Sequence, residues 1–288
     1  TPPWAGPRCD QLDVLPTPRG AGYLQRDEGR PTSSWKGTVL EGEDGRWHMW
    51  TSELTHHCGI DAWLGNSRVV HAVADSPTST FVREDVVFDV FATEPHVIRG
   101  PDKEYVMYFS ANFSSNVKPC VCTNGRGSTG EGDCPFWATT GNVISGTYLS
   151  WSKSANGPWS SPSQIFAAYR GPDTNISPWI LPNGTAIFFW RDWPYDYQAR
   201  PVRAGGTIHF GTATDWRDGS TYKQQHEVVF PDLGPMETED SFIYYDVPSR
   251  SFHAVFHHMY GLPWPRNVES WWLCAATGHA FSESGTDW

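Results

Sequence analysis

The sequence repeats one pattern of short strands three times over most of its length. In each copy an acidic or amide residue precedes an apolar strand. A turn rich in Gly, Asp or Asn leads into an aromatic strand, and a strand that begins with Gly ends near a Trp. The copies span residues 94–159, 175–216 and 239–288. Short strands that recur at a long, regular spacing are typical of β-propellers, in which each repeat forms one blade. Because the innermost strands of a propeller open around one central mouth, the pattern predicts both the fold and the place of a site.

An earlier and weaker copy of the pattern begins near Trp35. Residues 36–40 are expected to form a strand, residues 43–45 a hairpin turn and residues 46–51 a second strand, because Gly and Asp separate two runs of alternating apolar residues. A third strand over 66–74 and a short outer strand over 86–88 complete this blade.

Four blades therefore begin near residues 34, 94, 175 and 240. We expect an all-β, five-bladed β-propeller in which four blades are clear and the fifth is incomplete or completed by the N-terminal arm. Residues 1–30 are expected to be this irregular arm, and residues 31–288 a single propeller domain. We also expect the natural chain to continue beyond Trp288. Long loops are expected over 112–145 and 191–205, and loops of this length often line a binding face.

The composition argues against several partners. The 288 residues include 32 acidic and 21 basic side chains, for a formal net charge of -11. A chain with this charge lacks the basic field that collects phosphates, so neither nucleic acid nor an anionic membrane is expected as a partner. The sequence contains no run of 18 apolar residues, and no membrane span is expected.

Cysteines and glycosylation sequons favour a secreted glycoprotein. Cys120, Cys122 and Cys134 bracket a Gly-rich loop that could not be ordered by packing, and one disulfide is predicted there, with a zinc-binding loop as the alternative. Sequons begin at three asparagines: Asn112, Asn175 and Asn183. Of these, Asn175 is expected to face the mouth rather than to carry a glycan.

Carboxylates open two of the innermost strands. Glu94 opens the second blade, and Glu239 and Asp240 open the fourth, whereas the third opens with Asn175, which cannot ionise. Cleavage of a glycosidic bond usually needs one protonated and one ionised carboxyl group, and neighbouring carboxylates raise one of the two pKa values. These three carboxylates are the candidate catalytic residues. The alternative is that they hold the blades together by accepting hydrogen bonds from backbone amides.

Histidines are the second group of candidate site residues. His57, His96, His257 or His258, and His279 are expected near the mouth. There they would bind sugar, act as a general base or hold a Ca²⁺ or Zn²⁺ ion, although no cofactor is required.

Two further side chains are candidates for sugar binding. Arg191 would bind a uronate or a sulfate group, with a surface ion pair as the alternative role, and Trp35 would stack on a sugar ring.

Several phrases of the sequence resemble those of a known family. The phrases are Glu94-Pro95-His96-Val97, Ser154-Ala155-Asn156-Gly157-Pro158-Trp159, Glu239-Asp240-Ser241-Phe242 and the segment 278–285. They resemble five-bladed propeller glycoside hydrolases of the arabinanase and β-xylosidase type, the family-43-like group, over about residues 33–288. The segment with His48-Met49, His57-Cys58-Gly59, Trp63 and Asn66-Ser67 is more closely similar to uncharacterised secreted relatives from algae and other microbial eukaryotes.

The resemblance implies a catalytic set of three carboxylates on innermost strands: an Asp base, an Asp that orients it and a Glu acid. This sequence departs from that set, because residues 32–35 of the first blade contain no carboxylate and the third blade has Asn175. The first expectation is a secreted glycoside hydrolase-like protein that acts on a plant or algal polysaccharide through carboxylates at the mouth. The alternative is a non-catalytic carbohydrate-binding or structural extracellular propeller. A third and weaker interpretation is a polysaccharide lyase that uses His and Tyr.

Overall fold

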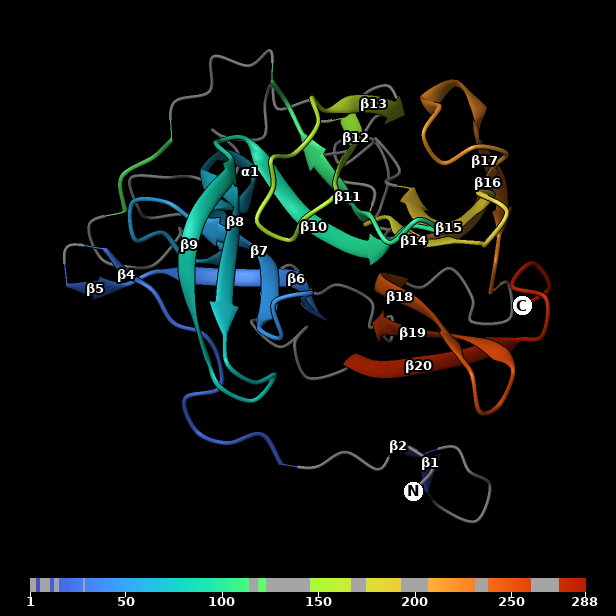
Figure 1. Ribbon diagram of the computed structural model, residues 1–288, viewed down its shortest axis with the longest axis horizontal. Helices are drawn as coiled ribbons and strands as arrows, with labels where there is room; N and C mark the ends of the chain where they lie inside the picture. The colour runs from blue at the N-terminus through green and yellow to red at the C-terminus, as the bar shows by residue number, and fades with distance from the viewer. Residues whose placement is uncertain are drawn as a thin grey trace, which may run out of the picture.

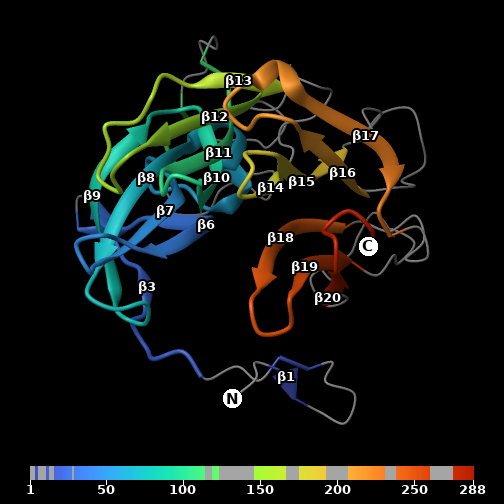
Figure 2. The ribbon, with the colours of Figure 1, turned by 45° about the vertical axis from the view of Figure 1, so that its right-hand side comes forward.

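The protein is an all-β propeller, which confirms the predicted fold class (Figure 1). The computed structural model describes residues 4–5, 11–12, 16–27, 29–113, 119–122, 146–166, 175–192, 207–230, 238–259 and 275–288. In these residues the helices are short: α1 (Trp63–Asn66), η1 (Ile60–Ala62) and η2 (Gly219–Thr221). Four sheets of antiparallel neighbours are arranged in an arc, as the two ribbon views show (Figures 1 and 2).

Each sheet is one blade, and its strands follow the chain from the innermost strand outward. Blade 1 consists of β6 (Ser33–Glu41), β7 (Trp47–Leu54), β8 (Ser67–Ala74) and β9 (Thr80–Phe88). Blade 2 consists of β10 (Ala92–Arg99), β11 (Tyr105–Ala111), β12 (Gly146–Ser152) and β13 (Ser163–Phe166). Blade 3 consists of β14 (Ser177–Ile180), β15 (Ala186–Asp192), β16 (Thr207–Ala213) and β17 (Tyr222–Val228). Blade 4 consists of β18 (Thr238–Asp246), β19 (Ser251–Met259) and β20 (Ala275–Ser282). The four blades begin where the repeated pattern predicted them.

The N-terminal arm is attached to blade 1. Strand β3 (Gly22–Tyr23) pairs in parallel with β9 and adds an outermost strand to the blade. The hydroxyl of Tyr23 donates to the fully buried carboxylate of Glu53, which also accepts from Arg68 at 2.5 Å and from Arg83 at 2.6 Å. Three donors on one carboxylate compensate for its removal from water. This contact holds residues 22–23 in place even though the sequence around them has little strand character.

The remaining strands of the arm form small separate sheets. Strands β4 (Arg26–Asp27) and β5 (Arg30–Pro31) pair with each other, as do β1 (Trp4–Ala5) and β2 (Gln11–Leu12). The β1–β2 pair lies on the side of the ring where blades 1 and 4 are the two ends of the arc (Figure 2).

Apolar layers between neighbouring blades form the core. One layer, with Trp50 and Tyr105, lies between blades 1 and 2, and another, with Tyr108 and Phe188, lies between blades 2 and 3. A third, with Phe189 and Phe252, lies between blades 3 and 4. Burying large aromatic rings gives about 1.5–3 kcal/mol each, so the many aromatic residues of the repeat are used mainly to join one blade to the next.

Glycine within the third strand of blades 3 and 4 has a steric role. A Cβ on Gly278 would lie 2.1 Å from the ring of Phe256, and a Cβ on Gly211 would lie 2.2 Å from the ring of Phe188. In both blades the aromatic ring of the second strand occupies the space above the glycine. The Gly of the repeated pattern is therefore explained by packing.

Two stacked histidine pairs occupy equivalent positions in blades 1 and 4. His48 Nδ1 lies 2.8 Å from His71 Nε2, and His253 Nδ1 lies 2.9 Å from His279 Nε2. In both blades the pair spans the second and third strands on a diagonal of the register. Burial, together with the nearby His48, lowers the pKa of His71 to about 4. Burial also lowers the pKa values of His253 and His279.

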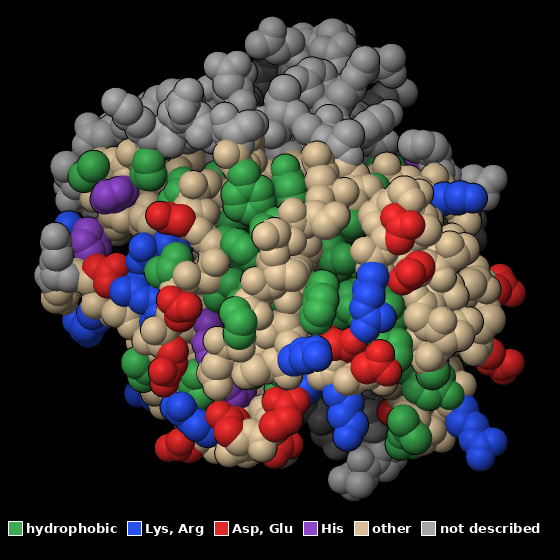
Figure 3. Space-filling model, turned by 45° about the horizontal axis from the view of Figure 1, so that its top comes forward, with side chains coloured by type: hydrophobic (Ala, Val, Ile, Leu, Met, Phe, Trp, Pro, Cys, Tyr) green, Lys and Arg blue, Asp and Glu red, His purple; other side chains and the backbone are tan. Residues whose placement is uncertain are grey.

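Charges on the surface are mixed. Acidic and basic side chains are interspersed over the face shown in Figure 3 rather than gathered by sign. Among the described residues, no helix has the length and apolar character needed to cross a membrane.

Candidate functional site

Four residues at the heads of the innermost strands have left-handed backbone conformations. They are Lys36 (φ 47°), Glu94 (φ 58°), Asn175 (φ 42°) and Asp240 (φ 53°), one from each blade, and we call them the ring residues. A β-bulge adjoins three of them, between Trp35 and Gly37, Thr93 and His96, and Glu239 and Phe242. A bulge redirects a side chain out of the strand's alternation. Positive φ is uncommon for residues other than Gly, and strained backbone of this kind is concentrated at functional sites.

Hydrogen bonds and ion pairs connect the ring residues across the blades. The amide nitrogen of Asn175 donates to both carboxylate oxygens of Glu94, at 2.9 and 3.0 Å, and its amide oxygen accepts from the backbone N–H of Asp240 at 2.9 Å. Lys36 Nζ lies 3.6 Å from Glu94 Oε2 and 3.4 Å from Asp240 Oδ1. All four side chains therefore meet around one axis, as the repeat predicted for Glu94, Asn175 and Asp240.

The two carboxylates of the ring differ in exposure. Glu94 is 2% exposed, whereas Asp240 is 41% exposed. Both oxygens of Glu94 accept from the side-chain NH2 group of Asn175, and the ammonium group of Lys36 lies nearby. Glu94 is thus a buried acceptor that holds the ring together, and Asp240 is the ring carboxylate that a ligand can reach.

Two stacked rings lie two residues further along the innermost strands of blades 2 and 4. The imidazole of His96 stacks on Phe242, with centroids 4.9 Å apart and an interplanar angle of 17°. Burial, assisted by the charge of Lys36, lowers the pKa of His96 to about 3, so this imidazole is neutral. Its Nε2 is buried without a hydrogen-bond partner. The His96–Phe242 pair closes the axis between these two blades and forms the floor of the mouth.

The other predicted site residues are placed as follows. Trp35 packs edge-to-face on Trp63 at 5.6 Å in an apolar cluster with Leu54 and Cys58, which is a packing role. His57 is half-buried in the loop after β7, Arg191 is buried near the end of β15, and His279 pairs with His253 on the second and third strands of blade 4. The side chains of Glu239 and His258 lie outside the described residues, as do residues 193–206.

Lys36 is the ring residue that the sequence reasoning missed. Residues 32–35 were expected to head the first blade, whereas the ring position is the next residue, Lys36. The signal was present, because Lys36-Gly37-Thr38-Val39-Leu40 has the same order of a polar head and an apolar pair as Glu94-Pro95-His96-Val97-Ile98. The hydroxyl of Thr38 also accepts from the backbone N–H of Val97 at 3.1 Å, which ties blade 1 to blade 2 just below the ring.

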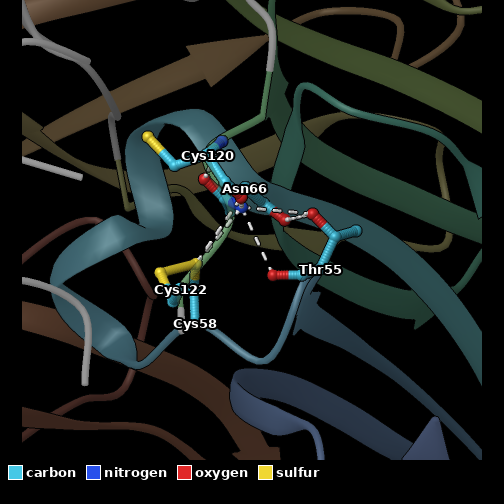
Figure 4. Close-up of a disulfide and its surroundings, with 5 residues drawn as sticks. All are labelled: Thr55, Cys58, Asn66, Cys120 and Cys122. Atoms are coloured by element: carbon cyan, nitrogen blue, oxygen red, sulfur yellow. Dashed lines mark hydrogen bonds between the residues drawn. A yellow bond between two sulfur atoms is a disulfide. The ribbon is translucent and has the colours of Figure 1, made fainter. Parts of the chain in front are cut away.

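A disulfide anchors the long loop of blade 2 to blade 1 (Figure 4). Cys122 pairs with Cys58, 64 residues earlier, and not within its own loop as the cysteine spacing suggested; Cys134 lies outside the described residues. The side chain of Asn66 donates to the carbonyl of Cys120 at 2.9 Å and accepts from its N–H at 3.2 Å. Because second strands end and third strands begin at the mouth, this disulfide holds residues 119–122 beside the mouth.

A metal ion at the mouth stays a prediction. In the described part of the chain, no three His, Cys, Asp or Glu side chains are grouped so that they could hold a metal ion. Of the histidines expected at the mouth, His279 pairs with His253 and His96 stacks on Phe242, and the side chain of His258 lies outside the described residues.

Comparisons with known proteins support the fold. No protein-family model matches the sequence, and no curated protein matches it either. The structure is similar to a thermostable family-43 glycoside hydrolase (12% identity, TM-score 0.53), of which the chain spans 65% with 78% of its own length. It is also similar to an endo-arabinase from Bacteroides thetaiotaomicron VPI-5482 (12% identity, TM-score 0.52; 94% of this chain, 79% of that one) and to an alpha-L-arabinofuranosidase from Lactobacillus brevis (11% identity, TM-score 0.54; 93% and 75%). The chain therefore has a fold of the kind found in propeller glycoside hydrolases. At these identities the likeness shows the fold alone.

Proposed function

We propose that this protein is a secreted, carbohydrate-binding propeller that holds a plant or algal polysaccharide at its mouth without cleaving it. The observation that carries the proposal is the set of ring residues: Lys36, Glu94, Asn175 and Asp240. Two of the four positions hold an ammonium and an amide, where a hydrolase of this fold needs carboxylates. The Cys58–Cys122 disulfide supports secretion, since such bonds persist mainly in oxidising compartments.

The four ring residues, as the structure describes them, do not supply the pair of carboxyl groups that hydrolysis needs. Glycosidases use one protonated and one ionised carboxyl group on either side of the scissile bond. Glu94 has both oxygens engaged by Asn175 and is almost fully buried. Among the ring residues, Asp240 is the one accessible carboxylate, and one carboxylate cannot be acid and base at once.

Sugar binding needs only what the mouth provides. A carboxylate such as Asp240 accepts hydrogen bonds from sugar hydroxyls, and the ammonium of Lys36 donates to ring or hydroxyl oxygens. The mutual ion pair at 3.4 Å holds both groups in place before a ligand arrives. Such preorganisation reduces the entropy lost on binding.

One observation favours hydrolysis as the second candidate. Because Lys36 Nζ lies 3.6 Å from Glu94 Oε2 and 3.4 Å from Asp240 Oδ1, these two oxygens are at most about 7 Å apart. That separation is compatible with the carboxylate pairs of glycosidases. If a substrate displaced Lys36, Asp240 as the acid and Glu94 as the base would be the pair to test.

The experiment measures retention and turnover on the same samples. Affinity electrophoresis in gels containing arabinan, xylan or β-1,3-galactan would be run beside an assay for released reducing ends. The variants are Asp240→Asn and Glu94→Gln, with Asp287→Asn as a control at an exposed position far along the chain from the ring. We expect retention of the wild type on at least one polysaccharide, about tenfold weaker binding for Asp240→Asn because a charged hydrogen bond is lost, and no reducing ends.

Two results would overturn the proposal. If the wild type releases reducing ends and neither Glu94→Gln nor Asp240→Asn does, hydrolysis is established instead. If the wild type is retained on none of the three polysaccharides, the carbohydrate assignment is wrong.

A further inference from the structure

A cavity of about 680 Å³ lies on the face of the propeller opposite the mouth. It is formed where the innermost strands end. Its walls come from the β6–β7 turn, the β10–β11 turn, the end of β12 and the turn after β16, so blades 1, 2 and 3 all contribute. We call it the exit-face groove, and its main side chains are Glu43, Asp102, Glu104, Trp151, Lys153 and Arg217. Its volume is in the range typical of small-ligand sites.

One wall of the exit-face groove is fixed by a buried carboxylate. Glu104 is only 5% exposed; it accepts from the backbone N–H of Asp102 at 3.1 Å and from the guanidinium of Arg217. Arg217 is further held by stacking on Trp216, with its Cζ 4.2 Å from the ring centroid. The remaining N–H groups of this half-exposed guanidinium are therefore positioned without help from a ligand.

The opposite wall is fixed in a similar way. The hydroxyl of Tyr105 donates to Glu43 at 2.7 Å, and Arg99 pairs with the same carboxylate while stacking on Tyr105 at 3.6 Å. Glu43 keeps 57% of its side chain exposed. The groove thus has preorganised donors on one side and a preorganised acceptor on the other.

An aromatic ring and a lysine complete the lining. Trp151 is partly buried against the core between blades 2 and 3, and its backbone exchanges hydrogen bonds with Ser160 at 2.8 and 3.0 Å. Lys153 is exposed and forms no ion pair with any residue that the structure describes. A rigid indole flanked by both donors and acceptors is the lining expected for a ring with several hydroxyl groups. With Lys103 the groove has three basic and three acidic side chains, and this mixed charge suits a neutral ring with hydroxyl groups better than a polyanion.

We propose that the exit-face groove is a second carbohydrate-binding site, with a sugar ring against Trp151 and its hydroxyls bonded to Lys153, Arg217 and Glu43. The proposal goes beyond the mouth, because none of these residues belongs to the ring. With one site on each face, the protein would bind two polysaccharide chains at once. Two linked sites raise the overall avidity and allow cross-linking of chains.

The test counts binding sites by calorimetric titration with hexasaccharides of α-1,5-arabinose, β-1,4-xylose and β-1,3-galactose. The groove variants are Trp151→Ala and Lys153→Ala, and Lys223→Ala on an outer strand is the matched lysine control. Asp240→Asn serves as the mouth variant. Because Trp151→Ala removes packing as well as stacking, its Tm is measured, and the exposed Lys153→Ala carries the test if Trp151→Ala unfolds.

We expect two sites in the wild type and in Lys223→Ala. Lys153→Ala is expected to weaken one site about tenfold, and Trp151→Ala to remove it, while the mouth site persists. Asp240→Asn should weaken the other site only. Stoichiometry and affinity that are unchanged in both groove variants, or no binding of any hexasaccharide outside the mouth, would overturn the proposal. If the wild type binds a hexasaccharide in the exit-face groove but not at the mouth, the proposed function is wrong while the second binding site is supported.

Discussion

The buried imidazole in the floor of the mouth predicts a specific sensitivity to acid. The pKa of His96 is lowered to about 3 in the folded protein, whereas in the unfolded chain it returns to the ordinary value of 6.5. Between these pH values the unfolded chain binds a proton that the folded protein does not. The free energy of unfolding therefore falls as the pH falls from 6.5 towards 3, by about 1.4 kcal/mol for each pH unit.

The expected loss is large relative to total stability. Between pH 6.5 and 4.5 the contribution of His96 amounts to about 2–3 kcal/mol, against a typical total of about 5–15 kcal/mol. The variant His96→Phe removes the titrating group and keeps an aromatic ring to stack on Phe242. Its free energy of unfolding, measured by urea titration at a series of pH values, is expected to fall less steeply than that of the wild type in this interval.

The difference between the two proteins isolates His96 from every other titrating group. At pH 7.5 the difference in free energy of unfolding between His96→Phe and the wild type reflects packing alone. At pH 4.5 this difference should have changed by about 2–3 kcal/mol in favour of His96→Phe. His56→Gln, at an exposed position, should give a profile parallel to the wild type. Parallel profiles for His96→Phe and the wild type would show that the imidazole titrates normally and that the floor of the mouth is open to water.

Three other perturbations follow from the contacts described above. Asn175→Asp places a carboxylate against Glu94 and should lower the free energy of unfolding at neutral pH by about 2–4 kcal/mol, with a smaller loss in acid; equal losses at both pH values would contradict the electrostatic account. Reduction of the Cys58–Cys122 disulfide frees a long loop in the unfolded chain and should lower stability by up to about 4 kcal/mol, measured with and without dithiothreitol, while Cys58→Ser should not respond to reductant. Gly278→Ala forces a methyl group into the Phe256 ring and should lower Tm with a cost of about 1–3 kcal/mol, whereas Thr277→Ala, at the exposed neighbour, should not.

Much of the fold was predictable because the residues of the repeated pattern are those that pack the blades. The glycine within β16 and within β20 is required by a ring in the preceding strand, and the apolar pairs of each innermost strand fill the layers between blades. These constraints act between neighbouring strands, so they leave a local signature in the sequence. The attachment of Tyr23 to Glu53 leaves none, because it depends on two arginines from β8 and β9 that are distant along the chain.

The site was predictable in part for the same reason. Glu94, Asn175 and Asp240 head their strands, and their position follows from the repeat. Their hydrogen-bond and ion-pair partners do not, since these depend on Lys36 from another blade and on which oxygen each N–H reaches. The histidines show the limit most clearly: His96 and His279 look alike in the sequence, yet one is buried on the axis and the other is exposed beside His253.

The left-handed backbone of the four ring positions restricts which chemistries the mouth could be engineered to display. A β-branched side chain is poorly tolerated at φ near +50°, whereas Gly, Asn and Asp are accepted at little cost. If these four positions were randomised, few folded variants would carry Val, Ile or Thr there, because of the backbone conformation and not because of ligand binding. An acidic residue at position 36 would meet the backbone requirement, yet it would lie against the carboxylates of Glu94 and Asp240 and be repelled by both, so the charge at this position is restricted by its neighbours as well as by φ.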